Sequence, residues 1–144
     1  MNVPDKVKVI VTEAFYGHEK TKAVIFSENS KLEKLESRVF IYSGIQKLTL
    51  PPKFKYYSRF TFDYANKLID IQISPKNEFF KIIDEKLLVG KDVIETDTTF
   101  NKLIFCCRNV ESVNIPPEIK IIEDYAFCNC YNLKSLLVRI HHLR

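Results

Sequence analysis

The sequence predicts an all-β-rich repeat solenoid, in which coils of about 23 residues stack on one another. Three observations predict it: several segments align with one another, apolar residues recur in the same columns, and Pro4, Pro51 and Pro116 fall in register. One coil of this length cannot bury its own apolar face. Neighbouring coils must therefore stack and share a core.

The repeat has four copies within a single domain over residues 1–144. Three copies align without a gap, and one aligns after a single deletion that follows its phenylalanine. The copies are residues 3–26, 28–50, 50–73 and 115–138. Six apolar columns run through them, with Thr21 as the exception, and one column is phenylalanine throughout, at Phe15, Phe40, Phe62 and Phe127.

The spacing within a copy predicts two segments on opposite sides of each coil. Residues 45–50 end in an alternation of apolar and polar residues, which is typical of a short strand with one buried face. The proline that follows in three copies has no amide hydrogen to donate, so it ends the strand. A second apolar segment then returns along the other side, and the phenylalanine fills the space between coils.

These residues carry a resemblance to a known family. The segment 115–136, IPPEIKIIEDYAFCNCYNLKSL, resembles a full repeat of the BspA-like leucine-rich repeat family. Residues 26–32, followed by Phe40 and then by Ser43, Gly44 and Ile45, resemble the variant repeats of its protozoan surface-antigen branch. Members of the family are described mainly as surface antigens and adhesins. The resemblance therefore implies a leucine-rich-repeat scaffold that binds a host or extracellular protein or glycan.

An island of different character interrupts the repeats at about residues 74–114. Pro51 and Pro116 lie about 65 residues apart, so about 42 residues exceed one period. Apolar runs at 79–84 and 86–89 predict a β-hairpin around Asp84 and Glu85, residues 102–106 predict a further strand, and 93–100 predict a longer loop. Similar islands in the family place Cys106 in a buried strand and carry a turn glycine where this chain has Glu85.

Composition and charge exclude several classes of function. The chain has 22 Lys plus Arg and 18 Asp plus Glu, a net charge of +4, and these charges are interleaved rather than gathered into a basic arm. This distribution disfavours nucleic acid as a partner. The longest apolar runs, such as residues 103–107, are far shorter than the ~20 residues of a membrane-spanning helix. We therefore predict no membrane span.

The sequence offers little for catalysis, so we predict that the chain is not an enzyme. Its histidines are His18, His141 and His142, and His18 falls in a column of small coil residues rather than beside a nucleophile. We predict no cofactor and no metal, and interpret the cysteines as buried free thiols because a C-C pair and a C-x-C pair lack zinc-knuckle spacing. A small enzyme or metal protein that uses Cys106, Cys107, Cys128 and Cys130 is the alternative.

The strand face is the candidate binding surface, since repeat proteins place extended binding sites there. Its mixture of charged, polar and apolar residues suits a protein or glycan partner, and an ordinary solvated face is the alternative. The outward positions, coil by coil, are Lys22, Ala23, Ile25, Gln46, Lys47, Thr49, Ile69, Asp70, Gln72, Glu111, Ser112, Asn114, Lys134, Ser135 and Leu137.

Two expectations concern the setting of the chain. The family resemblance implies the cell surface, whereas the charged start of the sequence, with no apolar leader, favours a cytoplasmic scaffold that recruits proteins. After Val138 the repeat lacks its turning proline. An open solenoid end of this kind predicts an irregular cap or self-association with another copy.

Overall fold

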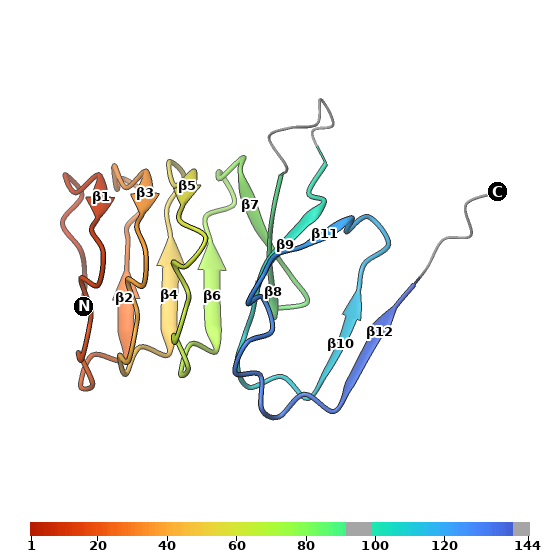
Figure 1. The fold of residues 1–144 in the computed structure, drawn as a ribbon. Coiled ribbons are helices and arrows are strands. Elements are labelled where there is room, and N and C mark those ends of the chain that lie inside the picture. The colour runs from red at the N-terminus through yellow and green to blue at the C-terminus, as the bar shows by residue number, and fades with distance from the viewer. Residues whose placement is uncertain (92–98, 140–144) are drawn as a thin grey trace.

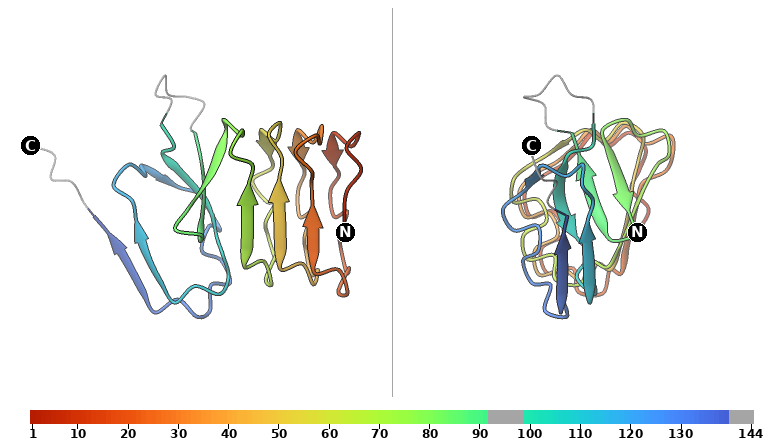
Figure 2. Two further views of the ribbon diagram at one scale, coloured as in Figure 1. Left: turned by 180° about the vertical axis from the view of Figure 1, so that it is seen from behind. Right: turned by 90° about the vertical axis from the view of Figure 1, so that its right-hand side faces the viewer.

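A computed structural model describes residues 1–91 and 99–139 of the chain (Figure 1). This part contains twelve β-strands and no helix. It confirms the predicted all-β solenoid with ~23-residue coils and a hairpin. The loop predicted at 93–100 lies mostly outside the described residues, as do His141 and His142. Figure 2 shows the N-terminal coils end-on, where they lie over one another along a common axis.

The front sheet of the N-terminal coils contains the predicted repeat strands. Strands β2 (Ala23–Ile25), β4 (Lys47–Leu50) and β6 (Asp70–Ile73) pair in parallel, with Lys47 opposite Asp70. Leu48 and Leu50 point into the core, while the alternate residues of β4 face outward. This alternation confirms one buried face for the front strands of the N-terminal coils. For the last repeat strand, at residues 135–138, the prediction is wrong: all four residues are exposed, and Leu136 and Val138 are 46 % and 49 % exposed.

A second parallel sheet lines the back of the same coils. It contains β1 (Val9–Ile10), β3 (Lys34–Leu35) and β5 (Tyr56–Tyr57) in that order. The apolar segment that follows each turn therefore returns on the opposite side, as predicted.

Between the two sheets, phenylalanine rings stack along the solenoid axis. The ring centroids of Phe15 and Phe40 lie 5.9 Å apart, and those of Phe40 and Phe62 lie 6.0 Å apart. Each of these rings is buried. The phenylalanine column of the sequence is thus one continuous stack through three coils.

Each phenylalanine sits at the centre of a repeated backbone turn. The residue three positions after it donates its amide to the phenylalanine carbonyl in all four coils, through His18, Ser43, Ala65 and Cys130, at 3.1–3.2 Å. Residues two positions before or after the phenylalanine adopt a left-handed conformation, which bends the chain around the ring. They are Glu13, Gly17, Arg38, Tyr42, Tyr64, Tyr125 and Asn129.

The inserted hairpin follows the third front strand. Strand β7 (Phe80–Ile83) pairs antiparallel with β8 (Leu87–Gly90), which pairs antiparallel with β9 (Lys102–Cys106). Asp84 and Glu85 both have positive φ, at 52° and 57°, as the mirror-image turn of a hairpin requires. The predicted hairpin and the predicted strand at 102–106 are both present.

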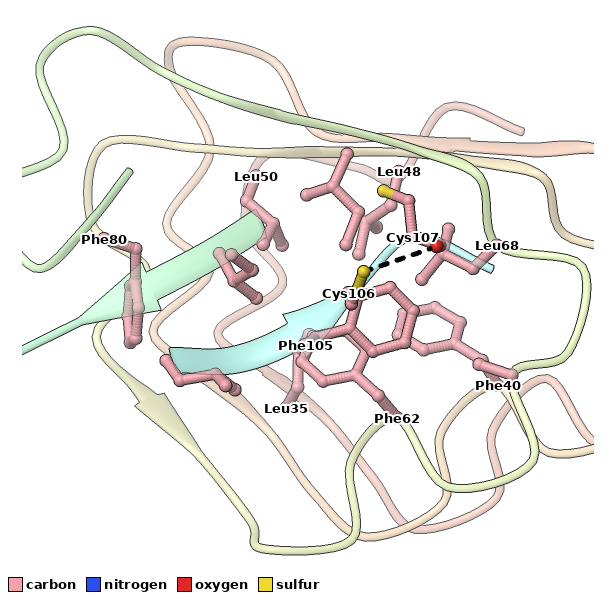
Figure 3. Close-up of a cluster of buried hydrophobic side chains, with 14 of the residues drawn as sticks. Leu35, Phe40, Leu48, Leu50, Phe62, Leu68, Phe80, Phe105, Cys106 and Cys107 are labelled. Carbon is pink, nitrogen blue, oxygen red and sulfur yellow. Dashed lines mark hydrogen bonds between the residues drawn. The ribbon is translucent and has the colours of Figure 1, made fainter. Parts of the chain in front are cut away.

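The front of the molecule resumes beyond the hairpin. Strand β10 (Ser112–Ile115) pairs in parallel with β12 (Ser135–Val138), and on the back β11 (Ile121–Ile122) pairs with β9. The sheet β10–β12 is separate from β2–β4–β6, and the hairpin lies between them (Figures 1 and 2). Figure 3 shows the core under this junction, where Phe40, Phe62 and Phe105 come together.

Candidate functional site

The predicted strand-face residues are all at least partly exposed, but the structure divides them between two sheets. Those from Lys22 to Gln72 lie on or beside β2, β4 and β6, and those from Glu111 to Leu137 lie on or beside β10 and β12. The hairpin separates the two groups. The candidate face is therefore two surfaces with an interruption after β6.

Charges of adjacent coils pair across each of these surfaces. Lys47 Nζ lies 3.8 Å from Asp70 Oδ2, and Lys134 Nζ lies 3.4 Å from Glu111 Oε2. Exposed ion pairs of this kind contribute about 0–1 kcal/mol to stability. The pairs leave both halves of the face with little net charge.

The interruption after β6 forms an open cleft. Residues 69–73 line one wall, and Ile82, Asp84 and Glu85 of the hairpin line the other. Its volume is about 700 Å³, which falls within the range of ~300–1,000 Å³ typical of ligand sites. Every charged residue of the lining is acidic, although the whole chain carries a net charge of +4.

The same cleft borders an edge of the front sheet. Strand β6 is the last strand of its sheet, and among the described residues it pairs only with β4. The Asp70 amide donates to Gln46 O at 3.0 Å, so the backbone groups of Asp70 and Gln72 face β4. Because these directions alternate along a parallel strand, those of Ile71 and Ile73 face the other way. The Ile73 end of β6 therefore presents edge groups to the cleft.

Sequence reasoning selected one wall of this cleft and missed the other. Ile69, Asp70 and Gln72 were expected on the strand face from the repeat columns. Asp84 and Glu85 were recognised only as a hairpin turn, because nothing local in the sequence indicates where the hairpin tip lies. The proximity of that tip to β6 is a tertiary property.

A row of exposed tyrosines is a second feature that the sequence analysis missed. Tyr16, Tyr42 and Tyr64 are 59 %, 54 % and 42 % exposed, and the neighbouring ring centroids lie 6.2 Å and 5.3 Å apart. Tyr42 and Tyr64 follow two residues after a phenylalanine of the core stack, at left-handed positions. The shared spacing from Phe40 and Phe62 was a signal available in the sequence.

The four cysteines are free thiols, and Cys106, Cys107 and Cys130 lie close to one another. Cys106 and Cys107 are buried, whereas Cys128 and Cys130 are partly exposed. Cys106 lies in β9, the buried strand that the family resemblance implied. Over residues 1–91 and 99–139, no group of three or more His, Cys, Asp or Glu side chains is placed to hold a metal ion.

His18 lies on the outside of the first turn. Its ring contacts Phe15 edge-on, with the centroids 5.7 Å apart, and its amide makes the turn hydrogen bond of its column. This is a packing role of the kind expected for a residue that replaces a small coil residue. In the described part of the chain, no helix is long and apolar enough to cross a membrane.

Comparisons with known proteins agree with this architecture. The sequence model of the BspA type leucine-rich repeat region matches six copies over residues 1–96 and 98–141. Among curated proteins, no match was found. Three solved structures share the fold, and the chain spans 33 %, 40 % and 48 % of their respective lengths.

The pneumococcal vaccine antigen PcpA is 30 % identical over 96 % of this chain, with a TM-score of 0.82. A leucine-rich cell surface protein of Faecalibacterium prausnitzii is 17 % identical over 94 % of the chain, with a TM-score of 0.71. A leucine-rich repeat protein of Eubacterium ventriosum is 13 % identical over 94 %, with a TM-score of 0.57. The last two comparisons show the fold alone. With the repeat match over nearly the whole chain, the protein belongs to the BspA-type leucine-rich repeat family.

Proposed function

We propose that the chain is a non-enzymatic protein-interaction module that binds an extended segment of a partner protein along its front face. The observation that carries this proposal is the edge of β6, which borders an acidic cleft between β6 and the hairpin. Elsewhere on the front, β2, β4 and β6 are joined in one sheet and β10 and β12 in another. β10 and β12 are edge strands as well, but the β6 edge is the one that borders the acidic cleft.

The chemistry of the cleft defines the kind of segment that fits. An extended segment can add to a sheet edge through main-chain hydrogen bonds, while its alternate side chains enter neighbouring pockets. Lys or Arg side chains on that segment would meet the carboxylates of Asp70, Asp84 and Glu85. Such complementarity contributes to the association rate and to specificity more than to affinity. We therefore propose a basic, extended protein segment as the ligand, and a glycan is the competing outcome of the test.

For the setting, we propose the cell surface and a role in adhesion, which is the role that the family resemblance implies. PcpA, named a vaccine antigen, supports the surface location. A second proposal is an intracellular scaffold that recruits cytoplasmic proteins. The observation that favours it is the presence of four free cysteines, because thiols persist in reducing compartments.

The binding proposal is tested by selecting random peptides displayed on phage against the full chain. We expect the selected peptides to carry Lys or Arg, and to lose at least tenfold in affinity for the double variant Asp84→Lys, Glu85→Lys. The control double variant is Glu19→Lys, Glu118→Lys, which makes the same charge change at exposed residues outside the cleft. An equal loss of peptide affinity in both double variants would show that only the net charge matters. Equal affinity for the unaltered chain and both double variants would place the site elsewhere.

A second set of variants tests the wider face. Replacing Gln46, Gln72 and Asn114 together by Lys adds charge at exposed or partly exposed front positions and should leave folding nearly intact. We expect this triple variant to lose peptide binding. The same peptides, and a glycan array probed in parallel, distinguish a protein ligand from a carbohydrate, because glycan binding without peptide binding would overturn the proposal.

The setting is tested by antibody labelling of the tagged full-length chain in its native cell. Labelling of intact cells supports surface adhesion. Labelling only after permeabilisation supports the intracellular scaffold, and moves the search for partners inside the cell.

A further inference from the structure

A buried arginine lies beneath the turn of the C-terminal coil. Arg108 is 5 % exposed, and its guanidinium carbon lies 4.1 Å from the ring centroid of Phe105. Its Nη1 donates to Ala126 O at 3.1 Å and to Cys106 O at 3.3 Å, and it lies 3.5 Å from Cys130 Sγ. Its Nε has no hydrogen-bond partner among the described residues. The fold therefore encloses a positive charge.

A buried positive charge requires a compensating negative charge nearby. In the described part of the chain, no carboxylate forms an ion pair with Arg108. The titratable groups around it are Cys106 and Cys107, from β9 and the residue after it, and Cys130, from the turn after Phe127. The negative charge of Asp70, on β6, contributes to raising the pKa of Cys107. The Cys130 sulfur is the one of these that accepts a hydrogen bond from the guanidinium.

The three thiols of the cluster, Cys106, Cys107 and Cys130, differ in pKa. The neighbouring Cys106 thiol, aided by the Arg108 guanidinium and opposed by burial, lowers the pKa of Cys130 to about 6. The Cys130 sulfur also lies 3.8 Å from Cys106 O, and the Cys106 sulfur lies 3.7 Å from Cys107 O. The neighbouring Cys130 sulfur, together with burial, raises the pKa of Cys106. Burial raises the pKa of Cys107 to about 11. These directions favour the negative charge on the Cys130 sulfur over the sulfurs of Cys106 and Cys107.

The position of Cys130 makes its sulfur reachable. It is partly exposed, whereas Cys106 and Cys107 are buried. Cys128 lies two residues earlier in the same turn and is also partly exposed. In the described part of the chain, the guanidinium makes a hydrogen bond to the Cys130 sulfur and none to Cys128. Cys128 therefore serves as a control: it is a partly exposed cysteine without a contact to the Arg108 guanidinium.

We propose that Cys130 is a site of covalent modification, whose sulfur is held as a thiolate by the buried Arg108 guanidinium and reacts with small-molecule disulfides and other soft electrophiles. The thiolate is the reactive form of cysteine, and a neighbouring arginine is one of the environments that stabilises it. This inference does not rest on the proposed function of the cleft, because the contact that carries it joins Arg108 to Cys130.

The reaction with a small disulfide, such as oxidised glutathione, proceeds by thiol–disulfide exchange. The Cys130 thiolate attacks one sulfur of the disulfide, so that a new S–S bond forms as the original S–S bond breaks. The departing sulfur leaves as a thiolate and takes a proton from water. The Cys130 sulfur is oxidised and the departing sulfur is reduced. The product is a neutral mixed disulfide that leaves Arg108 without its counter-charge.

The test follows alkylation of the folded full-length chain by iodoacetamide across pH 5.5–9, with the modified residue located by mass-spectrometric fragmentation. We expect the rate at Cys130 to reach half its plateau near pH 6. At pH 6.5 the Cys128→Ser variant should react about fivefold faster than the Cys130→Ser variant, because a higher thiolate fraction outweighs a lower intrinsic nucleophilicity.

Substitutions of Arg108 test whether its charge stabilises the thiolate. Arg108→Met should shift the Cys130 profile to higher pH, and Arg108→Lys should shift it less. Should Arg108→Met not fold, the ultraviolet absorbance of thiolate, compared between the unaltered chain and Cys130→Ser, reports the same midpoint without an arginine variant. Equal pH profiles for Cys128 and Cys130, or a thiolate signal that survives Cys130→Ser, would overturn the proposal.

Discussion

The rings of Phe62 and Phe105 lie 4.9 Å apart, so the phenylalanine stack of the N-terminal coils continues beyond the inserted hairpin. Phe105 belongs to β9, which pairs with the hairpin on one side and with β11 on the other. It extends the column formed by Phe15, Phe40 and Phe62. The two halves of the molecule therefore share one core, although their front sheets are separate.

Removing a ring from the junction should destabilise both halves. Phe62 is buried between Phe40 and Phe105, so Phe62→Ala leaves a cavity and should lower the free energy of unfolding by ~3–5 kcal/mol. Phe79→Ala is the control, because Phe79 is 40 % exposed and should have a much smaller effect. Urea denaturation measures both. An unchanged midpoint for Phe62→Ala would contradict the assigned register.

Asn77 connects the third coil to the hairpin through four hydrogen bonds. Its Nδ2 donates to Pro51 O and Phe54 O, and its Oδ1 accepts from the amides of Phe79 and Phe80. Asn77→Ala removes all four hydrogen bonds, of which the one to Pro51 O has a second donor, the Phe54 amide, and should destabilise the protein by ~1–3 kcal/mol. Glu78→Ala, at the exposed neighbouring position, should change stability little. Similar melting temperatures for the two variants would show that Asn77 does not hold the junction.

The chain contains two turn glycines that should respond very differently to alanine. A Cβ at Gly44 would lie 1.9 Å from Glu19 O of the preceding coil, a contact between backbones that only a shift of the coils can relieve. At Gly17 nothing lies within 4 Å of the added atom, and the effect is limited to its positive φ of 68°. Gly17→Ala should therefore cost about 1 kcal/mol, and Gly44→Ala considerably more. Equal thermal stability of the two variants would contradict the close approach of the first two coils.

The Cys130 thiolate predicts a pH dependence of stability. Its pKa is lowered to about 6 in the folded chain from a reference value of 9.0, so unfolding near neutral pH takes up a proton. The thiolate should therefore stabilise the folded state as the pH rises from 6 to 9, and this contribution should disappear as the pH falls through 6. The stability difference between the unaltered chain and Cys130→Ser, measured by urea denaturation, should grow from pH 5.5 to pH 8. A constant difference would argue against a folded-state thiolate.

Repetition made much of the fold predictable from the sequence. The first three coils repeat similar contacts, so the apolar columns identify most of their buried residues, such as Leu48 and Phe40, whereas Leu136 and Val138 of the last coil are exposed. The hairpin was also predictable, because its two strands are local and flank the turn at Asp84 and Glu85. Its turn uses two left-handed residues without glycine, a geometry that the residue types did not indicate.

The division of the front face was not predictable in the same way. Ser112 aligns with Ser135 in the front register, but the hairpin keeps β10 from pairing with β6. The contact of Arg108 with Cys130 likewise joins two coils through the core. Both features depend on contacts between segments that are distant in the sequence. The repeat columns predict only which side of a coil each residue occupies, so they could not predict these contacts.

The most direct test of the strand-face account is an NMR titration of the full chain with a peptide selected on it. We expect the backbone amide shifts to concentrate at Ile69–Ile73 and at Asp84 and Glu85, with the Ile73 amide newly protected from exchange. Shifts that concentrate instead on the exposed row Tyr16, Tyr42 and Tyr64, with the β6 edge unchanged, would contradict it.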